Sequence, residues 1–284
     1  MTDPVISPDG KWMWTGAEWI PAPPSSSQST NVSLQDSVIG GDVTITQNSA
    51  EDIADAMVTA LERMGFSGQS SPAELTPSQE VEVEQVLEMS EQLTSHGIEI
   101  DPWTEITLGN AAKLAGRTNT SQQHYLRSVE TFRKNGDRSG EAGSLNGLGL
   151  IAKTQGDLTE AERLHRESLA IAREIGDRQG EAASLNNLGL IAETRGDLAE
   201  AERLYRESLA IKREIGDRGG EAASLSNLGL IAQRRGDLAE AERLYRESLA
   251  INREIGDRGG EAASLQSLGE TALRLSNLAD AERS

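Results

Sequence analysis

Apolar and small residues recur along residues 181–215 with the spacing of two amphipathic helices. The first stripe has steps of three and four residues and consists of Leu185, Leu188, Gly189 and Ala192. The second stripe consists of Leu198, Ala201, Leu204, Tyr205, Leu209 and Ile211. Between the stripes, Gly196 suits the left-handed end of a helix, and Asp197 with Glu200 matches a capping box. The segment therefore predicts a helix–turn–helix hairpin.

This hairpin pattern repeats along the chain with a period of 40 residues. The units are 101–140, 141–180, 181–220, 221–260 and a partial copy, 261–284, that stops within its second helix. Residues 181–220 and 221–260 differ only at Asn186/Ser226, Glu193/Gln233, Thr194/Arg234 and Lys212/Asn252. Such a period predicts an all-α solenoid, in which each unit buries its apolar face against its neighbours.

The motif of each unit resembles the tetratricopeptide repeat (TPR). Its signature positions in 181–220 are Leu185, Leu188, Gly189, Ala192, Ala201, Tyr205 and Ser208. Two positions depart from the family, because Leu185 replaces its usual Trp and Arg213 replaces its usual Pro. The 40-residue length and the junction "IGDRxGEAASLxNLG" are similar to the long-repeat branch, as in G-protein-signalling polarity scaffolds and kinesin light chains. The resemblance covers 101–284 and implies a right-handed α-solenoid.

Differences between the near-identical copies suggest where a partner binds. Three of the four lie on the first helix, off its stacking stripe, and the resemblance implies that such positions line a concave groove for a peptide or helix. The groove residues expected are Asn110, Asn146, Leu150, Lys153, Thr154, Asn186, Leu190, Glu193, Thr194, Ser226, Leu230, Gln233 and Arg234. Neutral drift after a recent duplication is the alternative reading of so few differences.

The centre of this expected groove departs from the polarity scaffolds. Those relatives carry an Asn after the Leu-Gly pair, whereas here only Asn110 does, and Leu150, Leu190 and Leu230 follow in the next copies. A more apolar groove indicates a different ligand, either an amphipathic helix or another copy of the chain. The invariant second-helix surface, with pairs such as Glu202–Arg206, is interpreted as a solvated outer face.

The first hundred residues divide into several short segments. A Trp-rich motif at 1–24 contains Trp12, Trp14 and Trp19 and is either a small hairpin or docking tag or a flexible tail. A linker and β-hairpin at 25–50 turn around Gly40-Gly41. The remaining segments are a short amphipathic helix at 51–66, a linker at 67–77 and a capping helix at 78–100.

Composition narrows the class of protein. The formal net charge is −19, and residues 1–100 hold 16 acidic and two basic residues, so nucleic acid is not an expected partner. There is no cysteine, no secretory signal and no apolar run long enough to span a membrane. We therefore expect a cytoplasmic protein, and its low aromatic content of 3% fits closely stacked helices.

No pattern of catalytic residues stands out. His96, His124 and His165 share no motif, and His165 occupies the place of Tyr205 and Tyr245, where packing explains it. We expect no enzyme, cofactor or metal, but a scaffold that binds a protein or peptide. A self-assembling structural protein and a ligand-sensing regulator are the alternatives. The cut last helix also predicts fraying after Leu278.

Overall fold

The computed structural model describes residues 5–6, 12–14, 19–21, 33–34, 43–44, 49–66, 72 and 74–281. The chain divides into two units, Met1–Arg117 and Thr118–Ser284, which are described separately. The expected linker residues 25–32, 67–71 and 73 lie outside the described residues.

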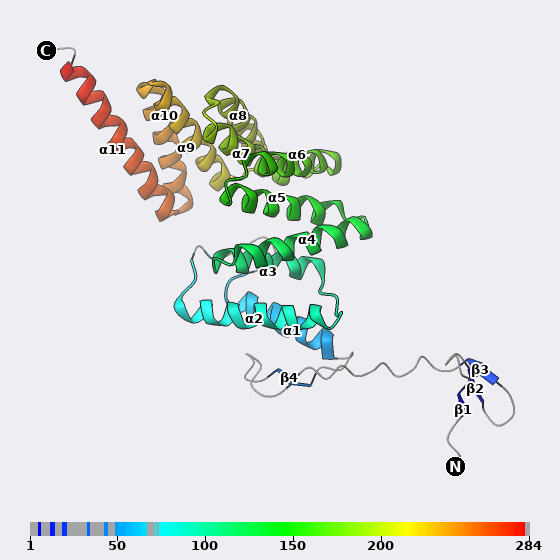
Figure 1. Cartoon of the computed structure of the whole chain (residues 1–284). Coiled ribbons are helices and arrows are strands. Elements are labelled where there is room, and N and C mark those ends of the chain that lie inside the picture. Colours follow the sequence, from blue (N-terminus) through cyan, green and yellow to red (C-terminus); the bar gives the residue numbers. More distant parts are fainter. Residues whose placement is uncertain are drawn as a thin grey trace. The chain divides into compact units, whose positions relative to one another are not determined.

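The Trp-rich segment contributes three short strands (Figure 1). Strands β1 (Val5–Ile6), β2 (Trp12–Trp14) and β3 (Trp19–Pro21) pair antiparallel in the order β1-β2-β3. The backbone of Trp14 lies opposite that of Trp19. We expected either a small hairpin or docking tag, or a flexible tail. The paired strands agree with a small β-structure.

The expected second hairpin is present, but its register differs from the expected one. Strands β4 (Ser33–Leu34) and β5 (Val43–Thr44) are antiparallel, with Leu34 opposite Val43. Eight residues therefore separate the strands, whereas a two-residue turn at Gly40-Gly41 would place Thr44 opposite Ser37. Alternating polarity predicts strands but leaves register to the turn, and that turn lies outside the described residues.

Three helices build the core of the N-terminal unit. They are α1 (Ser49–Arg63), α2 (Pro77–Ser95) and α3 (Pro102–Leu114). The apolar stripe of α1 is buried at Met57, Leu61 and Met64, and it shares one core with Val83, Val86 and Leu87 of α2 and Leu108 of α3. Helix α2 begins with a capping box between Thr76 and Gln79. Helix α2, the expected capping helix, shares this core with α3, the first helix of the first repeat.

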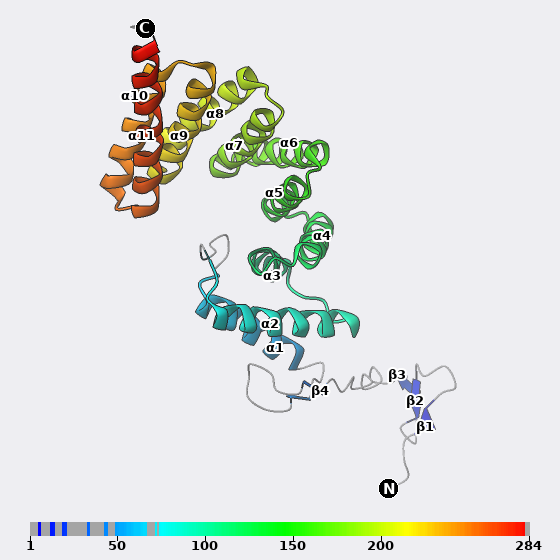
Figure 2. The same ribbon diagram turned by 60° about the vertical axis from the view of Figure 1, so that its left-hand side comes forward.

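The second unit is a stack of helical hairpins, and Figure 2 shows the successive helices turned from the first view. Aspartates cap α5, α7 and α9 by accepting a backbone N–H three residues on, and glycines with positive φ, such as Gly196 and Gly216, lie at the turns. The helices are α4 (Thr118–Asn135), α5 (Arg138–Thr154), α6 (Leu158–Ile175), α7 (Arg178–Thr194), α8 (Leu198–Glu214), α9 (Arg218–Arg235), α10 (Leu238–Ile255) and α11 (Arg258–Ala281). The predicted all-α solenoid of hairpins is confirmed.

Rings of the second helices pack on glycines of the first helices. A Cβ added to Gly189 would lie 2.6 Å from Cε1 of Tyr205, and one added to Gly229 would lie 2.7 Å from Cε1 of Tyr245. Such contacts are possible only without a side chain at the glycine. The glycine of the Leu-Gly pair therefore permits the close approach of the two helices in these units.

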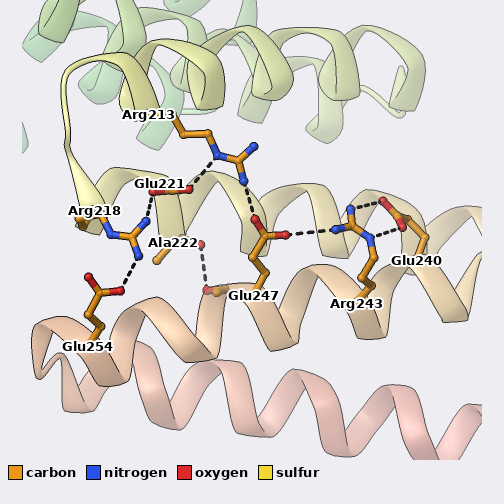
Figure 3. Close-up of polar contacts among 9 residues, drawn as sticks. Arg213, Arg218, Glu221, Ala222, Glu240, Arg243, Glu247 and Glu254 are labelled. Atoms are coloured by element: carbon orange, nitrogen blue, oxygen red, sulfur yellow. Dashed lines mark hydrogen bonds and ion pairs between the residues drawn. The ribbon is translucent and has the colours of Figure 1, made fainter.

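Ion pairs connect each hairpin to the next on the second-helix side, as Figure 3 shows for one junction. The buried carboxylate of Glu221 accepts hydrogen bonds from Arg213 at 2.8 Å and from Arg218 at 2.5 Å. Arg213 also bonds Glu247 at 2.5 Å in the following second helix. Arg213 stands where the family usually has Pro, so this departure supplies an inter-repeat contact. The same arrangement occurs at Glu141 and Glu181.

The last helix corrects one expectation. The repeat predicts a turn near residue 276 and the start of a second helix, but α11 runs without a break from Arg258 to Ala281. In the earlier units a glycine with positive φ, such as Gly196 or Gly236, ends this first helix. Here Ser276 takes its place, and a residue with a Cβ resists the left-handed backbone that the turn requires.

Candidate partner-binding face

The first helices of successive hairpins lie side by side and form one surface. The side-chain amide of Asn187 on α7 donates to Oδ1 of Asn146 on α5 at 2.9 Å. Asn227 on α9 donates in the same way to Asn186 on α7 at 3.0 Å. We call this surface of α5, α7 and α9 the first-helix face. It consists of the twelve expected groove residues other than Asn110, which belongs to α3 in the N-terminal unit.

Asn187 and Asn227 were not among the expected groove residues. Both are the second of two neighbouring polar residues, and only the first of each pair varied between the compared copies. A comparison of copies therefore misses them, because the donor of this hydrogen bond between helices is Asn in both copies. The useful signal would have been the spacing of 41 residues between each donor and its acceptor.

Glu193 is a buried link between helices, with only 8% of its surface exposed. Its Oε2 accepts a hydrogen bond from the Tyr205 hydroxyl at 2.9 Å, and its Oε1 pairs with Arg234 at 3.1 Å. Burial raises the pKa of Tyr205, and the neighbouring carboxylate of Glu193 raises it further. Glu193 therefore joins α7, α8 and α9, and contributes little surface to a partner.

Gln233 occupies the corresponding position on α9 and is buried as well, at 6% exposure. Its amide donates to Oγ1 of Thr271 on α11 at 3.2 Å. The near-identical copies differ at three positions of the first helix. At two of them, Glu193/Gln233 and Thr194/Arg234, the difference changes the contacts between repeats. Sequence comparison could not reveal this, because both residue types are usual on exposed surfaces.

The more accessible part of the first-helix face is apolar at its centre. Leu150, Leu190 and Leu230 are half-buried, while Thr154 and Thr194 are exposed at the helix ends. These two threonine hydroxyls donate to the carbonyls of Leu150 and Leu190 in their own helices, at 2.9 and 2.7 Å. Ser226 lies within 2.9 Å of the Ser248 hydroxyl.

Lys153 and His165 form an unusual pair in the unit 141–180. Lys153 is half-buried, and its ammonium makes no ion pair with any described residue. His165 is completely buried, and neither ring nitrogen has a hydrogen-bond partner among the described residues. Burial, and then the positive charge of Lys153, lower the pKa of His165 to about 4. The imidazole is therefore neutral at pH 7.

Two hollows lie on the second-helix side. One, of about 620 Å³, is lined by α8, α9 and α10, with Leu225 and Leu228 among its apolar residues. The other, of about 530 Å³, is lined in the same way by α6, α7 and α8. None of the expected groove residues lines either hollow. Their charged rims are internally paired, as in Arg206–Glu202 and Arg243–Glu240, so the expected ion pairs of the outer face are present.

The fold and its repeated contacts define an α-solenoid of helical hairpins. A sequence profile described as Tetratricopeptide repeat matches residues 101–174, 140–214 and 220–284, which together make up more than half of the chain. The chain belongs to the tetratricopeptide repeat family. No curated protein matches the sequence.

Solved structures share this fold at low sequence identity. The apo form of RapI has a TM-score of 0.65 at 13% identity, over 81% of this chain and 84% of that one. A Rap conjugation gene regulator of the plasmid pLS20, in complex with a Phr peptide, has a TM-score of 0.60 at 16% identity, over 86% and 69%. Nearly identical TPR-like repeats of a candidate kinesin light chain from Podosopora anserina have a TM-score of 0.52 at 17% identity, over 73% and 96%.

Within the described residues, no helix is both long and apolar enough to cross a membrane. The same part of the chain holds no cluster of three or more His, Asp or Glu side chains suited to a metal ion.

Proposed function

We propose that this protein is a non-enzymatic interaction scaffold that binds a peptide or helical segment of a partner protein on the first-helix face. The observation that carries this proposal is the row of half-buried leucines on the first helices, Leu150, Leu190 and Leu230. The first helices vary at three positions between 181–220 and 221–260, whereas the second helices vary only at Lys212/Asn252. Glu193/Gln233 lies at a buried contact between repeats, so the variation supports the proposal only at the half-buried Asn186/Ser226 and the exposed Thr194/Arg234.

The contacts of the two sides support the same assignment. On the second-helix side the arginines and glutamates pair with one another, which leaves few charges for a partner. On the first-helix face, Leu150, Leu190 and Leu230 form a row of half-buried apolar residues beside polar ones. An amphipathic helix or an extended peptide suits such a row. The Rap regulator with the same fold was solved with a peptide bound, which is consistent with this use.

The test starts with pull-down and mass spectrometry to identify a partner, followed by measurement of its affinity. Replacing Leu150, Leu190 and Leu230 with Glu places three charges on the face while leaving the buried links of Glu193 and Gln233 intact. We expect at least tenfold weaker binding, because burying an unpaired charge is costly. Replacing Arg166, Arg206 and Arg246 with Ala is the matched control on the exposed second-helix surface. Equal affinity of the face variant and the native chain, with intact helicity, would refute the proposal.

Self-assembly is a second candidate, favoured by exposed leucines of α11. Leu265 and Leu273 of α11 are 46% and 63% exposed, whereas Leu225, which corresponds to Leu265, is 1% exposed. Light scattering of the native chain and of a Leu265→Glu/Leu273→Glu variant tests this. A concentration-dependent dimer lost in the variant would favour self-assembly, and a native monomer at all concentrations would exclude it.

A further inference from the structure

Comparison of equivalent positions in neighbouring repeats reveals an incomplete polar cluster. In the unit 181–220, the carboxylate of Glu193 accepts from Tyr205 and pairs with Arg234 of the next unit. One unit earlier, the equivalent positions hold Lys153, His165 and Thr194. The carboxylate is therefore replaced by an ammonium, and the hydroxyl that donates to it by an imidazole.

His165 is held firmly in this place. A Cβ added to Gly149 would lie 2.6 Å from Cε1 of the His165 ring, so the ring packs directly on the backbone of α5. Its two nitrogens are buried and have no partner among the described residues. A neutral imidazole carries one N–H donor and one acceptor, and leaving both unsatisfied destabilises the fold.

Lys153 is also uncompensated. One unit later, the cation Arg234 pairs with the carboxylate of Glu193. Lys153 is half-buried and has no ion pair in the described part of the array. The exposed neighbour Thr194 brings no charge to it. Because its positive charge acts on His165, both side chains contribute to one local environment that lacks an anion.

We propose that Lys153 and His165 form a carboxylate-binding subsite of the first-helix face, which an acidic side chain of the partner occupies. This inference rests on the proposed function and names the chemistry of its ligand. The acidic side chain takes the place that Glu193 takes one unit later, accepts a hydrogen bond from a His165 nitrogen and pairs with the Lys153 ammonium. Because His165 is completely buried, binding requires a side-chain movement that exposes an edge of its ring.

Nuclear magnetic resonance of the native chain tests the subsite, since only three histidines need to be distinguished. The probe is the tripeptide Ala-Glu-Ala, acetylated and amidated so that the Glu side chain is its only carboxylate. We expect a saturable shift of the His165 ring signals with a dissociation constant on the order of millimolar. The bound carboxylate also raises the pKa of His165, because it stabilises the imidazolium. Ala-Gln-Ala with the same end groups binds at least tenfold more weakly.

Variants separate the subsite from general charge effects. Lys153→Met removes the cation and weakens binding at least tenfold, and Lys153→Glu supplies an internal carboxylate and abolishes it. Lys134→Met is the control, because Lys134 is an exposed lysine of α4 with no ion pair in the described residues, and its loss gives the same change in net charge. Circular dichroism verifies that each variant keeps its helices.

Three results would overturn the proposal: no His165 shift up to about 100 mM peptide, equal binding of the Gln peptide, or unchanged binding by Lys153→Met. A blocked peptide whose only carboxylate is its C-terminus provides a further arm. If this peptide binds more tightly than Ala-Glu-Ala, the ligand is a C-terminal carboxylate and not an acidic side chain. If Leu150, Leu190 and Leu230 matter for a partner while His165 does not respond, the face binds but the subsite assignment is wrong.

Discussion

The buried His165 makes the array less stable at acidic pH. The substitution His165→Tyr should remove this dependence. The pKa of His165 in the fold is about 4, compared with 6.5 for an ordinary histidine. The unfolded chain therefore binds a proton between these values while the folded chain does not, so stability falls as pH decreases from 6.5 towards 4. Above pH 6.5 both states are neutral, and the penalty is absent.

The size of this effect follows from the two pKa values. Linkage gives a loss of about 2 kcal/mol between pH 7 and pH 5, which grows to about 3 kcal/mol below pH 4. His165→Tyr removes it, since tyrosine does not titrate in this range, and Tyr205 and Tyr245 already fit the same position in other units. At pH 7 the variant exchanges two unsatisfied nitrogens for a hydroxyl that has no carboxylate opposite it, so we expect its stability to differ from that of the native chain by less than about 1 kcal/mol.

Urea unfolding of the native chain and of His165→Tyr at pH 7 and pH 5 measures the difference. Acidic residues also titrate towards low pH, but they contribute equally to both proteins, so the comparison isolates His165. The native chain should lose about 2 kcal/mol more than the variant over this interval. Equal losses in the two proteins would show that His165 is not held neutral by burial.

Three further predictions concern the contacts between helices. Gly189→Ala should cost roughly 1–3 kcal/mol in thermal or urea unfolding, because the methyl group would overlap the Tyr205 ring. Gly219→Ala should not destabilise the fold, because the nearest atom to its Cβ would be Oδ1 of Asp217 at 3.8 Å. Glu221→Gln should cost roughly 1–3 kcal/mol of unfolding free energy, because Arg213 and Arg218 lose a buried carboxylate. Glu254→Gln removes an exposed partner of Arg218 and should change stability by less than about 1 kcal/mol. Equal effects of the two substitutions would contradict the linking role of Glu221. Ser276→Gly with Asn277→Asp should break α11 and reduce hydrogen-exchange protection around that position, while strong protection of native amides after Leu278 would contradict the expected fraying.

The periodic signals in the sequence were sufficient for the architecture. Stripes such as Leu185 to Ala192, together with Gly-Asp pairs, predicted the hairpins, and the caps at Asp197 and Asp217 are observed. The amphipathic segments before residue 100 also became α1 and α2. Helix periodicity and capping are local properties, so each is readable without knowledge of the neighbours.

The candidate face was less predictable. Glu193 and Gln233 were expected on its surface, yet both are buried because Tyr205 and Thr271 reach them from other helices. The register of β4 and β5 and the unbroken α11 also differ from the expectations. In each case the outcome depends on a contact or a turn that the local pattern does not encode.

The sequence by itself determined the repeat, the stacking residues and the Gly-Asp turns between the helices of 141–260, because these follow from spacing along the chain. Only the tertiary structure decided which polar residues of the first helices are satisfied within the fold and which are not. Hydrogen bonds between residues about 40 positions apart depend on how adjacent hairpins are placed. For that reason Lys153 of the first-helix face and His165 of α6, which the sequence does not mark as a pair, share one environment. Within the described residues, neither ring nitrogen of His165 has a hydrogen-bond partner there.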